Sequence, residues 1–312
     1  YRELYQQIGH YWGEQPGTSG PVYVGAFVMM LFVLGLFVVK GPMKWALLVG
    51  TIFSIMLSWG KNFMPLTDFF IDYVPMYNKF RTVSSILVVA EFAIPLLAVL
   101  ALKEIIEKPQ VLRENMKQLY ISFGITGGLA LLFAIAPRMF FSSFISSSEI
   151  QALQSLPQEH IGAVINNLTT MRVAMFTADS WRSFIIIVIG TALLWLFIDK
   201  RIKAEWAVAA ILVLSLADMW DVNKRYLNDG DFTSEAGRTQ TFAKSDADAY
   251  ILEDTAKYYR VLNMATSTFN DGVTPYWHKV IGGYHAAKLR RYQDVIDVPL
   301  TREVGAMQNA II

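Results

Sequence analysis

The 312-residue chain contains no cysteine, only four histidines and few charged residues. Without cysteine it can form no disulfide, thiol nucleophile or cysteine-ligated metal site. Charged residues make up 17% of the chain, below the roughly 25% typical of soluble domains, and hydrophobic residues make up 54%. The formal net charge is only +1, and no single basic patch stands out. We therefore expect no nucleic acid as a partner.

Polar stretches are scarce in the first two-thirds of the chain, which contains six apolar segments. A helix needs roughly 20 residues to cross about 30 Å of hydrocarbon. Six segments near this length predict six membrane spans, of which the second, fifth and sixth are short. They are residues 21–39, 45–59, 82–102, 118–136, 183–198 and 205–220.

Short loops with clustered basic residues follow the first, third and fifth of these segments. The positive-inside rule places such loops in the cytoplasm. Residues 1–20, the loops 60–81 and 137–182, and the region 221–312 are then extracytoplasmic. The basic residues are Lys40, Lys44, Lys103, Lys108, Arg113, Lys117, Lys200, Arg201 and Lys203.

The predicted fold is mainly α: a polytopic transmembrane helix bundle (residues 21–220) with interfacial helices and a small α/β extracytoplasmic region after residue 220. That region shows turn signals, a helical segment at 245–255, a strand-like alternation at 258–264 and a helical segment at 286–297. The chain begins at Tyr1 without a methionine or signal peptide, and it ends on an apolar run. We therefore expect an internal fragment of a longer protein, with the last domain truncated.

Each long outer loop contains an amphipathic pattern. In 60–81 and in 161–175, apolar residues recur at helical spacing. We expect the first helix to lie flat in the membrane interface, and the second to shield a cleft or dock on the C-terminal region. Asp68 and Asp72 share one face of the first helix, where they could bind a divalent metal. Two aspartates without a histidine or further acids nearby are more typical of a solvated helix face.

Arg81 and Glu91 are candidate binding residues. Arg81 stands where the third segment begins, so its guanidinium could grip a phosphate or simply reach the lipid head groups. Glu91 lies inside that segment, four residues before Pro95. An acid there costs about 2.5–3.5 kcal/mol, so it must face a polar cavity or a hydrogen-bonding neighbour.

A basic stretch near the C-terminus supplies the remaining candidates. Gly282 and Gly283 precede the helical segment at 286–297, whose first turns carry basic residues. Backbone amides and cations at a helix start can hold an anion; alternatively the cations pair with nearby acids. The candidate residues are His278, Lys279, His285, Lys288 and Arg291.

The stretch from Tyr276 to Gln293, YWHKVIGGYHAAKLRRYQ, resembles a motif of YfhO-family membrane proteins, in the form common in Bacteroidetes. The segments YWGEQP (11–16), GPVYVG (20–25), SWGKN (58–62) and NKFR (78–81) are similar to that family as well. The chain departs from the family's "FRxP" pattern, because Val83 stands where proline is frequent. The matches extend over nearly the whole chain.

This resemblance implies a glycosyltransferase of the C superfold in a bacterial cytoplasmic membrane. Such proteins transfer a sugar from a polyprenyl-phosphate carrier to a cell-envelope glycan acceptor on the outer side. The family's catalytic acid would precede Tyr1, and Arg81 would contact the carrier phosphate. The sequence does not identify a cofactor; a divalent metal in the full-length protein is one candidate. The alternatives are a membrane transporter or lipid flippase and a non-catalytic envelope assembly protein.

Overall fold

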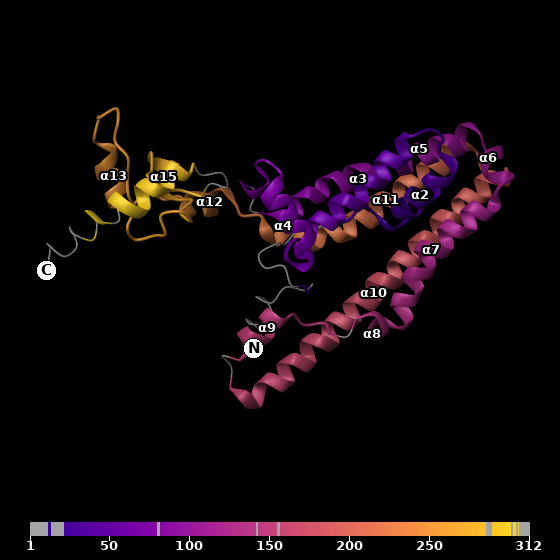
Figure 1. The fold of residues 1–312 in the computed structure, drawn as a ribbon, viewed down its shortest axis with the longest axis horizontal. Coiled ribbons are helices and arrows are strands. Elements are labelled where there is room, and N and C mark those ends of the chain that lie inside the picture. Colours follow the sequence, from indigo (N-terminus) through magenta and orange to yellow (C-terminus); the bar gives the residue numbers. More distant parts are fainter. Residues whose placement is uncertain are drawn as a thin grey trace. The chain divides into compact units, whose positions relative to one another are not determined.

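The computed structural model describes residues 12–13, 22–79, 82–141, 143–154, 157–284, 289–300, 302–303 and 305 (Figure 1). These residues are mainly helical and contain no strand. They fall into two compact units, here called the first unit (Tyr1–Phe69 and Thr82–Leu227) and the second unit (Phe70–Arg81 and Asn228–Ile312).

Helices make up most of the first unit. They are α2 (Ala26–Val38), α3 (Met43–Ser58), α5 (Val88–Glu107), α6 (Gln110–Arg113), α7 (Met116–Ile135), α8 (Pro137–Phe140), α9 (Ser147–Leu153), α10 (Gln158–Ile198) and α11 (Ala204–Tyr226). Helix α4 (Met64–Tyr73) crosses the division between the units. The second unit contains α12 (Glu235–Thr241), α13 (Asp246–Leu252), α14 (Thr274–Trp277) and α15 (Arg290–Val295).

Within the described ranges, three helical stretches are long and apolar enough to cross a membrane: Val83–Glu107, Met116–Ile135 and His160–Ile198. Helix α3 and the stretch Gly60–Tyr73 add a fourth if this pair, bent by 107°, counts as one span. The membrane prediction is thereby supported in its coarse form, whereas six spans are not confirmed. The first predicted span is represented by α2, which has only 13 residues because residues 22–25 are not helical.

Helix α2 is central to the core of the first unit. Gly35 of α2 packs so closely on α5 that an added Cβ would lie 2.9 Å from Leu97 Cγ. Gly190 of α10 faces Phe27 of α2, where an added Cβ would lie 2.2 Å from a ring carbon. Small residues at such crossings let helices approach closely, as in membrane helix bundles.

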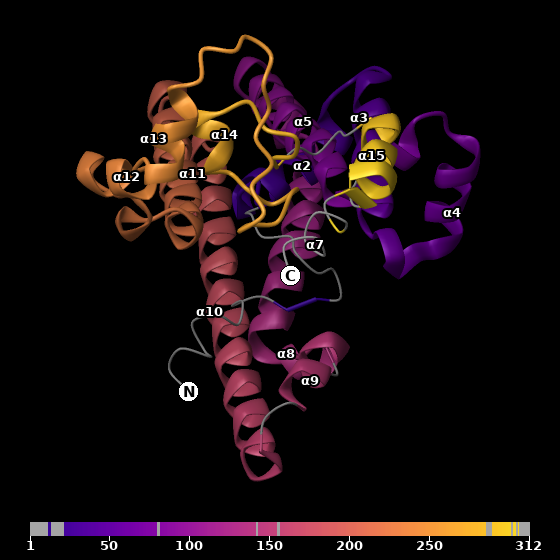
Figure 2. The same cartoon turned by 90° about the vertical axis from the view of Figure 1, so that its left-hand side faces the viewer.

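Helix α10 is continuous over 41 residues, about 60 Å. The amphipathic helix predicted at 161–175 and the span predicted at 183–198 are therefore one helix, and their prediction as separate elements was wrong. Figures 1 and 2 show α10 extending past α7, with α8 and α9 alongside the extension. The apolar face of the extension packs on α9, because Val164 and Leu168 form a core cluster with Ile145 and Leu153.

The amphipathic helix predicted in the loop 60–81 is present as α4. Asp68 and Asp72 are both exposed on it. No group of three or more metal-ligating side chains occurs among the described residues. The exposure of the two aspartates agrees with a solvated helix face.

The second unit differs from the predicted α/β region. The segment 258–264 forms no strand; it contributes one isolated parallel bridge, between Val261 and Val280. The described part of the helix predicted at 286–297 is α15, followed by a π-helical turn over Ile296–Leu300. The alternation of apolar residues misled the prediction, because a strand needs a paired neighbour over several residues.

Candidate functional site

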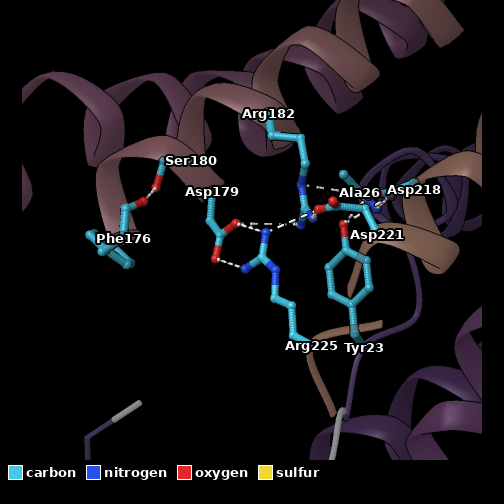
Figure 3. Close-up of polar contacts among 9 residues, drawn as sticks. All are labelled: Tyr23, Ala26, Phe176, Asp179, Ser180, Arg182, Asp218, Asp221 and Arg225. Atoms are coloured by element: carbon cyan, nitrogen blue, oxygen red, sulfur yellow. Dashed lines mark hydrogen bonds and ion pairs between the residues drawn. The ribbon is translucent and has the colours of Figure 1, made fainter. Parts of the chain in front are cut away.

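A group of charged side chains lies where α10, α11 and the segment before α2 meet (Figure 3). We call it the Arg182 cluster. Its members are Tyr23, Asp179, Arg182, Asp218, Asp221 and Arg225.

Asp218 is the buried member of the cluster, with 3% of its surface exposed. Its carboxylate accepts hydrogen bonds from the Tyr23 hydroxyl (2.9 Å to each oxygen) and from the Ala26 backbone amide (2.8 Å). Ala26 is the first residue of α2, where backbone amides lack partners within the helix and a negative charge is favourable. Asp218 therefore joins α11 to the start of α2.

Arg182 lies among three carboxylates. Its Nη1 donates to Asp221 Oδ2 at 2.6 Å, and its Nε and Nη2 lie 3.9 Å from oxygens of Asp218 and Asp179. Its guanidinium also lies 5.6 Å from the centre of the Tyr23 ring. The buried Nε makes no hydrogen bond with any described residue. A buried donor of this kind is rare, and a ligand oxygen could satisfy it.

Arg225 completes the cluster from α11. Its two terminal nitrogens each donate to one oxygen of Asp179 at 2.7 Å, and Nη2 also donates to Asp221 at 3.0 Å. The hydrogen bond from Arg182 is the main cause that holds the pKa of Asp221 below its ordinary value. Three carboxylates and two guanidiniums give the cluster a formal charge of −1.

A cavity of about 350 Å³ adjoins the cluster. Asp179 and Arg182 line it together with the Tyr23 ring. Hydroxyl groups come from Ser180 and Ser183, and the apolar wall includes Phe133 and Phe176. Mostly apolar walls with a few convergent polar groups are typical of a small-molecule site.

Aromatic rings extend from that wall between α7, α8 and α10. Phe176 lies 5.4 Å from Phe133 and 5.2 Å from Phe141, and Trp12 lies 4.6 Å from Phe144, measured between ring centres. Aromatic pairs at these distances stabilise packing beyond their buried area. The charged cluster is thus flanked by an aromatic surface at the end of α7.

The residues predicted from the sequence do not join this site. Glu91 is half-buried in the first turn of α5 and forms no hydrogen bond or ion pair in the described part of the chain. Arg81, His285 and Lys288 lie outside the described residues.

The stretch from His278 to Gly283 packs within the second unit. The buried His278 ring bonds through Nε2 to Asp248 of α13 at 2.9 Å. Lys279 is exposed and contacts the Lys257 carbonyl at 3.4 Å. Gly283 has φ 98°, and a Cβ on Gly282 would lie 1.7 Å from the Thr268 carbonyl oxygen, so both positions require glycine.

Arg291 is exposed on α15 and makes no hydrogen bond or ion pair where the chain is described. Helix α15 has only six residues, and it begins at Arg290. Within the described residues, no hydrogen bond or ion pair joins Arg291 to His278 or Lys279. The predicted anion site at this helix start therefore remains a hypothesis.

Sequence reasoning missed the Arg182 cluster, although a signal was present. Asp218 is an acid inside the predicted span 205–220, and such residues mark functional or paired positions. Asp179 and Arg182 are three residues apart, and Asp221 and Arg225 are four apart, so each pair shares a helix face. The sequence analysis placed these charged residues at the ends of spans, and it therefore did not consider them as partners of one another.

Comparison with known proteins identifies no relative: no family model, curated protein or solved structure matches the chain. The likeness to YfhO-family proteins thus remains a prediction from the quoted motifs. Function has to be inferred from the geometry of the Arg182 cluster and its cavity.

Proposed function

We propose that the protein is a membrane glycosyltransferase-like protein, which takes a sugar from a polyprenyl-phosphate-linked donor and transfers it to a cell-envelope glycan acceptor. The cavity beside Arg182 would hold the sugar-phosphate end of that donor. The observation that carries this proposal is the meeting of charged, hydroxyl and aromatic groups in one cavity at the end of apolar helices.

A lipid-linked sugar has three chemical parts, and the cavity offers a partner for each. The Arg182 guanidinium, with its unsatisfied Nε, suits a phosphate oxygen. The Asp179 carboxylate can accept hydrogen bonds from sugar hydroxyls. The aromatic wall around Phe133 and Phe176 suits the apolar chain and the face of a sugar ring. Because the cluster has a formal charge of −1, a bound phosphate would compete with the three carboxylates for the two arginines.

The proposal includes the topology inferred from the sequence. Six spans in a bacterial cytoplasmic membrane, with loops 60–81 and 137–182 and the region after residue 220 outside, would place the Arg182 cluster at the outer boundary. The positive-inside pattern supports this orientation. Within the described residues, Arg113 supports the packing of the opposite ends, because its Nε donates to the Ile198 carbonyl at 2.7 Å.

The resemblance adds further binding residues to the proposal. Arg81 would contact the carrier phosphate, and His278, Lys279, His285, Lys288 and Arg291 would take part in donor or acceptor binding. For His278 the support is weakest, because its buried ring already bonds to Asp248. The general base is not assigned.

Binding of undecaprenyl phosphate to the purified full chain in lipid nanodiscs tests the proposal. Arg182→Lys keeps the charge but loses the planar fork, so we expect affinity to fall by about tenfold. Arg201→Ala is the matched control, because Arg201 is an exposed arginine beyond the other end of α10. Unchanged affinity in Arg182→Lys, or an equal loss in the control, would reject the cavity as the donor site.

One observation favours the transporter or lipid-flippase alternative. The bend of 107° between α3 and the stretch Gly60–Tyr73 is compatible with a broken span, and discontinuous helices form substrate sites in many transporters. A flippase moves the intact lipid, whereas a transferase separates sugar from carrier. Release of free undecaprenyl phosphate from a labelled sugar donor therefore distinguishes the two functions.

A further inference from the structure

We propose that a second cavity of the first unit binds the phosphodiester head group of an anionic bilayer lipid through Arg138. This cavity has a volume of about 230 Å³ and lies between α8, α9 and the first half of α10. Arg138, Ser143 and Thr169 line it together with apolar side chains such as Ile150 and Ile165. The site is separate from the Arg182 cluster and does not depend on the function proposed for it.

The charge of Arg138 is available for a ligand. Arg138 is exposed and forms no ion pair or hydrogen bond within the described ranges. The carboxylate on neighbouring α9, Glu149, is already bound by Arg172, whose Nη1 and Nη2 donate at 2.9 and 2.6 Å. A guanidinium can bind a phosphate through two parallel hydrogen bonds. Among the described residues that line the cavity, Arg138 is therefore a positive group with no acid beside it.

The cavity lies next to the end of a candidate span. Helix α7 ends at Ile135, so Arg138 follows a candidate span by three residues. Phe133 of α7 contacts Phe176 of α10, and Thr169 precedes Phe176 by seven residues, which is about 10 Å along the helix. The polar layer of a bilayer adds about 5–8 Å on each side of the hydrocarbon. Arg138 therefore lies close enough to the end of the span to reach that layer.

Exposed apolar side chains continue from the cavity toward the span. Met139 is 80% exposed, Ile135 is 66% exposed, and Ile150 at the cavity wall is 41% exposed. A lipid with its head group on Arg138 could lay its acyl chains on this surface. Charge and apolar surface thus match an anionic lipid better than a soluble phosphate.

An arginine near a span end can also reach the head groups without binding any particular lipid. Binding in a cavity, by contrast, predicts that one lipid molecule binds saturably, and that its affinity depends on the shape of the site as well as on its charge. Lys117 supplies the comparison, because it is an exposed cation at the opposite end of α7 that lines neither cavity.

Native mass spectrometry of the full chain in detergent, titrated with phosphatidylglycerol or phosphatidylcholine, tests the proposal. We expect one saturable phosphatidylglycerol adduct and no matching phosphatidylcholine adduct. Arg138→Ala should weaken it at least about tenfold, and Lys117→Ala should leave it unchanged. Equal losses in the two variants would overturn the proposal in favour of general electrostatic attraction.

Two further experiments separate loss of binding from loss of folding, and a lipid phosphate from a soluble one. Thr169→Phe fills much of the cavity and keeps the charge of Arg138, so it should also abolish the adduct while the thermal unfolding midpoint stays near wild type. Retention of the adduct in folded Thr169→Phe would overturn the cavity as the site. Millimolar glycerol 1-phosphate should not displace the lipid; displacement would identify a soluble phosphate as the ligand and contradict the lipid assignment.

Discussion

Single side chains of the Arg182 cluster connect elements that are far apart in the sequence. Asp218 of α11 bonds to Tyr23 and to the amide of Ala26, more than 190 positions earlier. A buried carboxylate is costly unless hydrogen bonds and positive groups compensate for its lost hydration. Here the Tyr23 hydroxyl, the α2 amide and Arg182 supply that compensation.

Asp218→Asn tests how much the charge contributes, because asparagine keeps the shape and removes the negative charge. We expect a loss of about 1–3 kcal/mol in the free energy of unfolding, since Arg182 and the start of α2 lose a charged acceptor. Thermal unfolding of the purified protein measures it. Asp199→Asn, an exposed position in the turn after α10, should cost far less. Similar losses for both variants would contradict the bridging role of Asp218.

Arg172 and Glu149 form a second ion pair, which holds α9 on α10. The Arg172 side chain is completely buried and also donates to the Phe144 carbonyl at 2.8 Å. Burial by itself raises the pKa of Glu149, but hydrogen bonds from Arg172 and from the Ser146 backbone outweigh it. The pKa is therefore lowered from the ordinary 4.5.

This shift predicts a dependence of stability on acid. Because the folded-state pKa of Glu149 is below the unfolded value, the unfolded chain takes up the proton first, and stability is lost as the pH falls through the folded pKa. We expect the unfolding midpoint to drop below about pH 4.5, and Glu149→Gln to reduce that drop. Melting curves between pH 7 and pH 3.5 measure both. An identical acid response in the variant would show that Glu149 does not contribute.

At the scale of elements, apolar periodicity predicted helices well and their connections poorly. The segments that became α3, α5, α7 and α11 were located from their length and composition. The fusion of 161–175 with 183–198 was missed because the charges at Asp179 and Arg182 resemble a loop between two helices. In the structure these charges bind partners on α11, so the helix continues through them.

Helix crossings depend on glycines whose role the sequence alone does not reveal. Gly190→Ala would put a Cβ 2.2 Å from a ring carbon of Phe27, which forces α10 and α2 apart. We expect a loss of about 1–3 kcal/mol, the usual cost of overpacking a core. Gly128→Ala on α7 is the control, because nothing lies within 4 Å of its added Cβ. Thermal unfolding of both variants measures this loss. A Gly190→Ala protein as stable as the Gly128→Ala control would contradict the close packing of α10 on α2 at this position.

For the whole molecule, the sequence predicted a helical protein with apolar spans, and the structure agrees to that extent. The α/β character of the second unit was not found, since Val261 and Val280 form only an isolated bridge. The candidate site was missed because the sequence shows its charged pairs one helix at a time, whereas the contacts among α2, α10 and α11 that join them appear only in the fold. The resemblance motif near His278 is explained in part by packing.

Topology is the first property of the whole molecule to test. The basic loops predict that positions 108 and 200 face the cytoplasm and that position 246 faces outside. The chain has no cysteine, so single cysteines at Lys108, Lys200 or Asp246 can be labelled without background. A membrane-impermeant maleimide on intact cells should modify only the cysteine at position 246. Labelling at position 108 would contradict the orientation.

The central claim is that the cavity beside the Arg182 cluster holds a polyprenyl-linked sugar phosphate. Photo-crosslinking in living cells tests it most directly, with p-benzoylphenylalanine placed at Phe176 in the cavity wall or at Leu212, an exposed apolar residue of α11. We expect mass spectrometry to find a polyprenyl-phosphate adduct at position 176, and only phospholipid adducts at position 212. Phospholipid adducts alone at both positions would contradict the account.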